Sequence, residues 1–406
     1  MEELDRKYAQ VLLKRCLTFN NTDTLLIDYE THEHDKFVNI VIDEAKKMNV
    51  KNIQKVLYDD DELHDYYKNT ALEDIKLNPL IDRTPWNEAA KKNGCVLHIS
   101  TYIPNLMDDI QQDKIDKAFS IKSKTYEYYK ENNKKYSFPW CICLYPNKRW
   151  AEFLFKNDKN AYEKLYNYII QMCMIDKDNP LESWKQHINT NNYYKNRLNE
   201  LEVTKFYYKN SLGTDFEIGF PKDYIWLNLD KYDQFGSPII CNMPSYEIFT
   251  TPDRNTANGI VYNSKPLIRN GVLIDDFYIE FKDGKVINYN AKVGYEALKS
   301  IIGCSLNTNR LGEVALVNHN SPISNTNVVF YHTLFDENSS CHLALGDGFP
   351  KSIKNFENMT KEELEKLGVN FANSHVDFMI GTSDLEITAD TKEGKKYVFK
   401  KGNFSL

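Results

Sequence analysis

The chain lacks the features that mark membrane-bound and secreted proteins. No stretch reaches the roughly 18 consecutive apolar residues of a membrane-spanning helix, and the first residues, MEELDRKYAQ, are charged where a secretion signal would be apolar. Its eight cysteines have no regular spacing that would predict a disulfide framework. We therefore expect a cytoplasmic protein that does not contact a membrane.

The chain also lacks the marks of nucleotide and nucleic-acid binding. It carries a net charge of −7, with 51 Lys and Arg against 58 Asp and Glu. Non-specific binding to nucleic acid depends on clustered basic side chains that neutralise phosphates, so we expect no nucleic-acid partner. Neither a G-x-G-x-x-G string nor a G-x-x-x-x-G-K-[ST] string is present, which leaves dinucleotide and P-loop sites without support.

The 406 residues are enough for two domains with a core each. Residues 1–204 alternate between short apolar runs and helical periodicity, which predicts an N-terminal α/β domain with a doubly wound parallel sheet. The strand candidates are residues 23–28, 55–60, 95–100 and 140–146, and the helical stretches include residues 32–49, 113–133 and the whole of 147–200.

Residues 205–406 have a different character. Short strand candidates are separated by Gly, Asn and Asp, and KDGK at 282–285 is a strong hairpin turn. Helices are expected over 296–302 and over 360–367, where Thr360 and Glu363 form a capping box. This half is predicted to be an α+β catalytic domain with a mixed sheet.

Five side chains in this second half are of the types that bind metal ions. They are Glu247 in NMPSYEIFTTPD, Glu313 in LGEVALV, His342 in TLFDENSSCHLALG, and His375 and Asp377 in HVDFMIG. Carboxylates that can bridge, together with imidazoles, form a common ligand set for a two-ion hydrolytic centre.

Most of these residues would be unremarkable alone. Glu313 resembles a glutamate on a half-exposed strand, Glu247 a surface turn residue, and His342 a hydrogen-bonded core residue. His375 and Asp377 differ, because residues two apart in a strand point to the same face. Two ionisable groups that face the same way from an apolar strand are costly unless they are paired or bound to a metal.

Taken together, the four strings resemble the aminopeptidase T / aminopeptidase S family of bacterial metalloaminopeptidases, the thermophilic-type aminopeptidases. They occur in the order and spacing of that family over roughly residues 205–390. The resemblance implies a metal-dependent aminopeptidase in which two ions of zinc, cobalt, manganese or magnesium activate a water. It also implies peptide substrates and a homodimer. The metal ligands would be Glu247, Glu313, His342, His375 and Asp377.

The resemblance makes Glu313 a plausible bridge between the ions. If Glu313 does not bridge, it could carry the proton to the leaving amine, and Glu337 is a second candidate for that role.

One departure from the family concerns catalysis. Family members usually have a tyrosine seven residues after the ligand histidine, in a string such as HLALGRAYP, where this chain has HLALGDGFP and therefore Phe349. Phenylalanine has no hydroxyl to stabilise an oxyanion, and loss of one such donor costs about 10²–10³ in rate. Tyr246 also stands where many members have an acidic residue.

Two other functions stay open at this point. The same ligand types serve other dinuclear metallohydrolases, such as phosphoesterases and amidohydrolases, although those sites usually contain more histidine. Phe349 would also be compatible with a catalytically weakened member that binds metal or peptide.

Overall fold

The computed structural model describes residues 1–133, 135–269 and 272–406. Packing divides the chain into two compact units. Unit 1 consists of Met1–Gln186 and Asp230–Pro244, and unit 2 of His187–Leu229 and Ser245–Leu406. The predicted domains, 1–204 and 205–406, are a statement about which segments fold independently. The division into compact units does not test this, so the domains stay a prediction.

Unit 1 contains a five-stranded sheet in which all neighbours are parallel, in the order β10-β4-β3-β1-β2. Its strands are β1 (Thr24–Tyr29), β2 (Asn52–Leu57), β3 (Cys95–Ser100), β4 (Trp140–Leu144) and β10 (Asn242–Met243). The predicted parallel sheet is thus confirmed. Sequence analysis missed β10, since two residues have no periodicity to detect.

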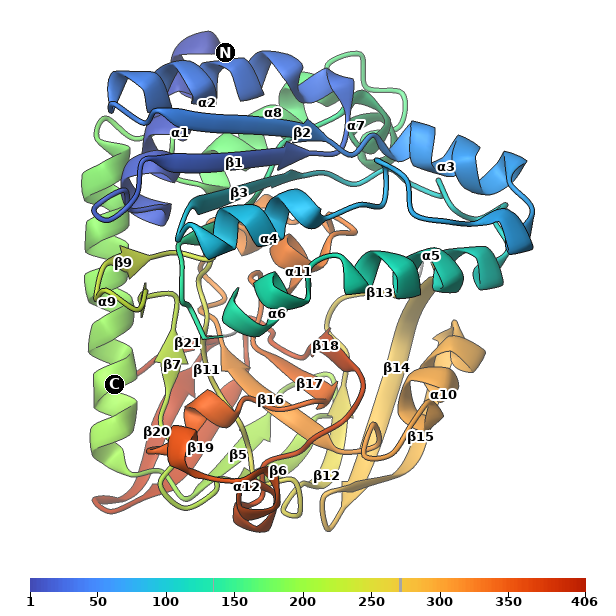
Figure 1. Ribbon diagram of the computed structural model, residues 1–406. Helices are drawn as coiled ribbons and strands as arrows, with labels where there is room; N and C mark the ends of the chain where they lie inside the picture. Colours follow the sequence, from blue (N-terminus) through green and yellow to red (C-terminus); the bar gives the residue numbers. More distant parts are fainter. Residues whose placement is uncertain (134, 270–271) are drawn as a thin grey trace. The chain divides into compact units, whose positions relative to one another are not determined.

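Helices cover both faces of this sheet, as its buried apolar strands require. α2 (Asp35–Lys47) lies over one face and α4 (Thr84–Lys91) over the other (Figure 1). The other helices that begin in unit 1 are α1 (Glu2–Val11), α3 (Asp60–Asn69), α5 (Gln112–Lys124), α6 (Glu127–Asn133), α7 (Lys148–Leu154), α8 (Ala161–Met172) and α9 (Pro180–Leu201). The single helix expected over 113–133 is therefore two helices, α5 and α6. No helix of the described residues is long and apolar enough to cross a membrane.

Unit 2 is α+β, and the large mixed sheet expected there is two sheets whose strands pair antiparallel. The smaller one has the order β18-β17-β16-β11-β7, and we call it the site sheet. Its strands are β7 (Leu227–Asn228), β11 (Ile248–Thr250), β16 (Leu311–Leu316), β17 (His342–Gly346) and β18 (His375–Met379).

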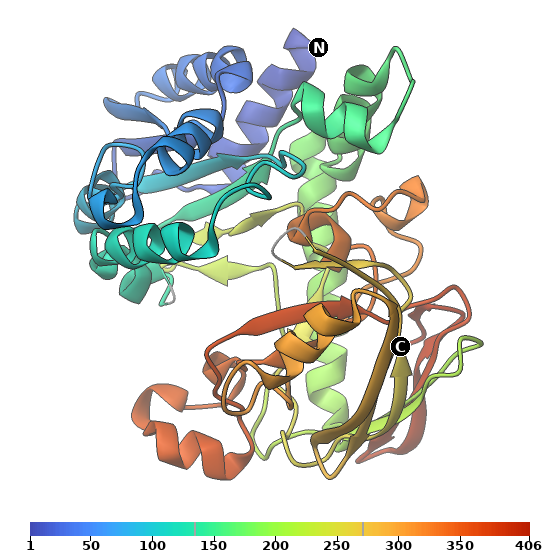
Figure 2. The same ribbon diagram turned by 90° about the vertical axis from the view of Figure 1, so that its right-hand side faces the viewer.

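The larger sheet of unit 2 has nine strands. They are β5 (Lys205–Lys209), β6 (Asp215–Gly219), β12 (Asn258–Tyr262), β13 (Leu267–Arg269), β14 (Val272–Lys282), β15 (Lys285–Val293), β19 (Glu386–Thr391), β20 (Gly394–Lys400) and β21 (Asn403–Phe404). The helices of this unit after α9 are α10 (Tyr295–Gly303), α11 (Thr333–Glu337) and α12 (Lys361–Leu367). α10 packs beside the β14–β15 hairpin (Figure 2), and α12 has the predicted capping box.

Strand alternation gives the site sheet two different faces. One face is apolar and shares a core with β5, β6 and β14 of the larger sheet. The site-sheet residues in that core are Ile248, Leu311, Val314, Leu316, Leu343, Leu345, Val376 and Phe378. The residues between them point to the opposite face, and Glu313, His342, His375 and Asp377 are among these. The core thereby holds the polar side chains on a rigid support.

Candidate metal centre

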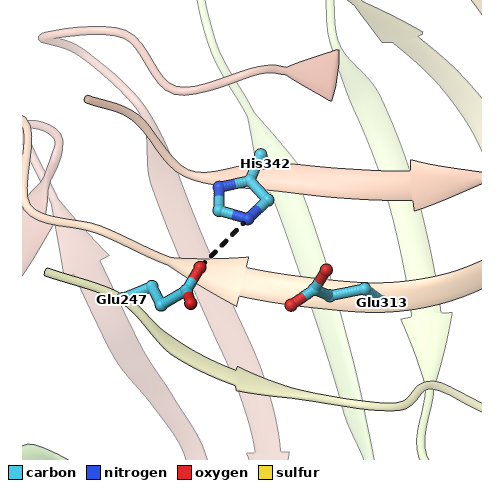
Figure 3. Close-up of side chains that lie close together, drawn as sticks. All are labelled: Glu247, Glu313 and His342. Carbon is cyan, nitrogen blue, oxygen red and sulfur yellow. Dashed lines mark ion pairs between the residues drawn. The ribbon is translucent and has the colours of Figure 1, made fainter. Parts of the chain in front are cut away.

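The five predicted ligands lie together on the polar face of the site sheet. They form two groups that share one member: Glu247, Glu313 and His342, and Glu313, His375 and Asp377. Within each group the potential ligand atoms lie within 4.8 Å of one another. Figure 3 shows the first group, with Glu247 and His342 paired and Glu313 beside them. Glu313 is thus the carboxylate common to both donor groups.

The strand register explains why these residues meet. Ala344 of β17 pairs with Glu313 on one side and with Asp377 on the other. Ala315 of β16 pairs in the same way with His342. Directly paired residues share a face of the sheet, so the methyl group of Ala344 lies between Glu313 and Asp377, and that of Ala315 lies between His342 and Phe249. The alanines therefore leave room above the sheet.

Backbone carbonyls orient both imidazoles. His342 Nδ1 lies 3.0 Å from the carbonyl oxygen of Ser340, and His375 Nδ1 lies 2.7 Å from that of Asp347. Because a carbonyl can only accept, each Nδ1 carries the proton and each Nε2 faces the carboxylates. A hydrogen bond of this kind at the far ring nitrogen is usual for metal-binding histidines.

The Nε2 atoms contact the carboxylates directly. His375 Nε2 lies 3.0 Å from Glu313 Oε2 and 3.0 Å from Asp377 Oδ1. His342 Nε2 lies 3.5 Å from Glu247 Oε2. These contacts bring two imidazole nitrogens and three carboxylates to one place.

Glu337 joins this cluster from α11, which packs on β18. Burial raises the pKa of Glu337 well above its usual range, and the negative charges of Asp377 and Glu247 raise it further. Sequence analysis considered Glu337 only as a proton carrier. Its place in DEN, five residues before His342, was the available signal, but only the packing of α11 shows that it reaches the other carboxylates.

The cluster has more negative charge than its own side chains can balance. It holds four carboxylates and two imidazoles, and no Lys or Arg of the described residues forms an ion pair with these carboxylates. Burial, together with the charge of Asp377, raises the pKa of Glu313 to about 7 against the lowering effect of His375. Burial opposes protonation of His342, but its hydrogen bond to Glu247 and the charge of Glu313 outweigh it and raise its pKa to about 10.

Buried carboxylates that outnumber the cationic side chains around them are typical of a site that binds cations. The mixture of carboxylate oxygen and imidazole nitrogen suits divalent ions. The residues present therefore fit divalent cations.

Phe349 borders this centre. Its ring centroid lies 5.3 Å from that of His375, in an edge-on arrangement, and 5.0 Å from that of Phe249. The departure noted in the sequence is thus beside the candidate ligands rather than remote from them.

Comparison with known proteins gives the family. Residues 1–404 match the family described as thermophilic metalloprotease (M29). Aminopeptidase 2 of Geobacillus stearothermophilus is 34% identical, with 100% of this chain and 98% of the relative covered. Aminopeptidase AmpS of Bacillus subtilis (strain 168) is 30% identical, with 98% of each covered.

A solved structure shares the fold. Wild-type AmpT from Thermus thermophilus superposes over 100% of both chains with a TM-score of 0.90 and 22% sequence identity. The family match and the full-length relatives confirm the predicted family and enzyme class: this chain belongs to the thermophilic metalloprotease (M29) family and is a peptide hydrolase.

Proposed function

We propose that this chain is a metal-dependent aminopeptidase that uses two divalent ions to release N-terminal residues from peptides. The observation that carries the proposal is the membership of Glu313 in both donor groups. The names of the relatives, aminopeptidase 2 and aminopeptidase AmpS, support the same activity here.

Each donor group would hold one ion. Glu247, Glu313 and His342 would bind the first, and Glu313, His375 and Asp377 the second, with Glu313 as the bridge. Zinc, cobalt and manganese suit this mixture of nitrogen and oxygen donors, and magnesium would depend more on the carboxylates. When bound, the ions supply Lewis acidity and a water activated for attack on the peptide carbonyl.

The protein side chains contribute binding and proton transfer. Glu337, whose pKa is raised by burial, could pass a proton to the leaving amine, and Glu313 is the alternative carrier. The His375 side chain is 28% exposed and that of His342 is 1% exposed, so the peptide would approach from the His375 side.

Metal content and activity, measured on the same preparation, test this function. We expect two ions per chain and cleavage of aminoacyl anilides that disappears with a chelator and returns with zinc, cobalt or manganese. Metal binding without cleavage would instead support a catalytically weakened member. Faster hydrolysis of a phosphomonoester than of the anilide would support a different dinuclear hydrolase.

We also propose a cytoplasmic homodimer. All eight cysteines are free thiols, which is usual in reducing compartments. Four of the exposed large apolar side chains lie on the β14–β15 hairpin and at the start of α10: Val272, Ile287, Val293 and Tyr295. Light scattering should give twice the chain mass, and Ile287→Lys should lower it to that of one chain if this surface forms the contact.

A further inference from the structure

The segment that carries Glu247 is held by side chains on both sides. Glu247 directly precedes β11, which begins at Ile248. The carbonyl oxygen of Ser245 accepts a hydrogen bond from His187 Nε2 at 3.0 Å, and that of Tyr246 accepts one from Asn191 Nδ2 at 3.4 Å. On the other side, the backbone amide of Tyr246 donates to Asn338 Oδ1 at 2.7 Å.

Asn338 differs from the other two supports because it also contacts the cluster itself. Its side chain is fully buried, at 0% exposure. Its Nδ2 donates to the carbonyl oxygen of Leu334 at 3.1 Å and to Glu337 Oε1 at 3.4 Å. One amide thus links the backbone next to Glu247 with the carboxylate of Glu337.

We infer that Asn338 is a positioning residue of the metal centre, which sets the affinity for the ion held by Glu247, Glu313 and His342. The inference rests on the proposed function. The link requires an acceptor toward Tyr246 and a donor toward Glu337, and a primary amide supplies both. Aspartate would keep the acceptor and lose the donor, and leucine, of similar shape, would lose both.

The effect on the two ions is expected to be unequal. The group of Glu313, His375 and Asp377 is placed by the hydrogen-bonded strands β16, β17 and β18. The hydrogen bonds of the Asn338 side chain go to Tyr246, Leu334 and Glu337 instead. Loss of the amide should therefore release Glu247 and Glu337 while leaving the other group in place.

Stepwise zinc titration of the full-length apo protein against a competing chelator dye tests this role. We expect Asn338→Leu to lower the affinity for one zinc ion by about 10–100-fold, which is the usual effect of removing a residue that supports a metal ligand. The affinity for the other ion should be unchanged. The zinc affinity of Asn338→Asp should lie between those of wild type and the leucine variant. This variant provides the measurement if the leucine variant does not fold. The lost activity of Asn338→Leu should return when zinc is raised above the weakened dissociation constant.

Asn228 offers a matched control. It is 1% exposed and lies on β7 of the same sheet, and its Nδ2 donates to Asn192 Oδ1 at 2.9 Å. Asn228→Leu should lower thermal stability and leave both zinc affinities as in wild type. Wild-type zinc affinity in both Asn338 variants, or an equal loss for both ions, would overturn the inference. Fewer than two ions in the wild-type protein would instead refute the proposed function.

Discussion

Glu313 is the side chain that the proposed chemistry uses twice, so its replacement should affect both ions. Glu313→Gln keeps the size of the side chain but removes its charge and leaves only one oxygen that can bind a metal ion. We expect metal content to fall below one ion per chain and activity to fall by about 10²-fold or more.

Glu386→Gln is a suitable control for that change. Glu386 is an exposed carboxylate on β19 of unit 2, and its replacement should leave metal content and activity unchanged. Two ions and wild-type activity in Glu313→Gln would exclude the bridging role.

Phe349 is the second residue with a specific expectation. Its ring already contacts His375, so a hydroxyl added at its far end would enter the polar surroundings of the centre. Phe349→Tyr should raise kcat by about 10²-fold if the missing donor limits turnover, with little change in metal content. Steady-state kinetics on an aminoacyl anilide measure this, with Phe249→Tyr as a control for an added hydroxyl on the neighbouring ring. An unchanged kcat in Phe349→Tyr would show that turnover here does not depend on that hydroxyl.

At the scale of elements, β17 lies between β16 and β18 and separates the ligands that these two strands carry. Ala344 separates Glu313 from Asp377 by a single methyl group, and a longer side chain there would occupy the space in which the ligands converge. Ala344→Leu should therefore abolish binding of both ions, as measured by metal analysis after dialysis.

An oversized side chain in the core away from the ligands should destabilise the fold without loss of metal. Ala389 is a fully buried alanine on β19, in the apolar core of unit 2. Ala389→Leu should cost about 1–3 kcal/mol of stability and leave metal content unchanged. Equal metal loss in both variants would show that general destabilisation, rather than the lost space, is responsible.

The sequence predicted those elements whose signal is local. The apolar runs of β1 and β3, the capping box at Thr360 and the shared face of His375 and Asp377 all follow from periodicity within a few residues. The division of the second half into two sheets depends on pairing between distant strands, for which one sequence has no local signal. The same limit applies to Glu337, which reaches the cluster only because α11 packs on β18.

At the scale of the whole molecule, buried histidines should make the fold sensitive to acid. Burial lowers the pKa of His34 to about 4 from 6.5, and it likewise lowers those of His187 and His332 to about 4. A lowered pKa means that the unfolded chain binds the proton more readily. The stability is therefore fully present above pH 6.5 and is lost as the pH falls toward 4.

His34, which is fully buried, can account for about 3 kcal/mol over that range. Urea unfolding between pH 7 and pH 4 should show the loss, and His34→Gln should make it smaller by up to about that amount. The same pH dependence in His34→Gln and wild type would mean that His34 is not buried in its neutral form.

The alternation of the site sheet also limits how such a chain can change during evolution. Since ligands and core residues alternate along β18, a shift of its register by one residue would exchange the two sets. Val376 and Phe378 would then face the polar side, and the imidazole and carboxylate would enter the core. Changes of length should consequently accumulate in the loops between β16, β17 and β18, while the strands themselves vary by substitution alone.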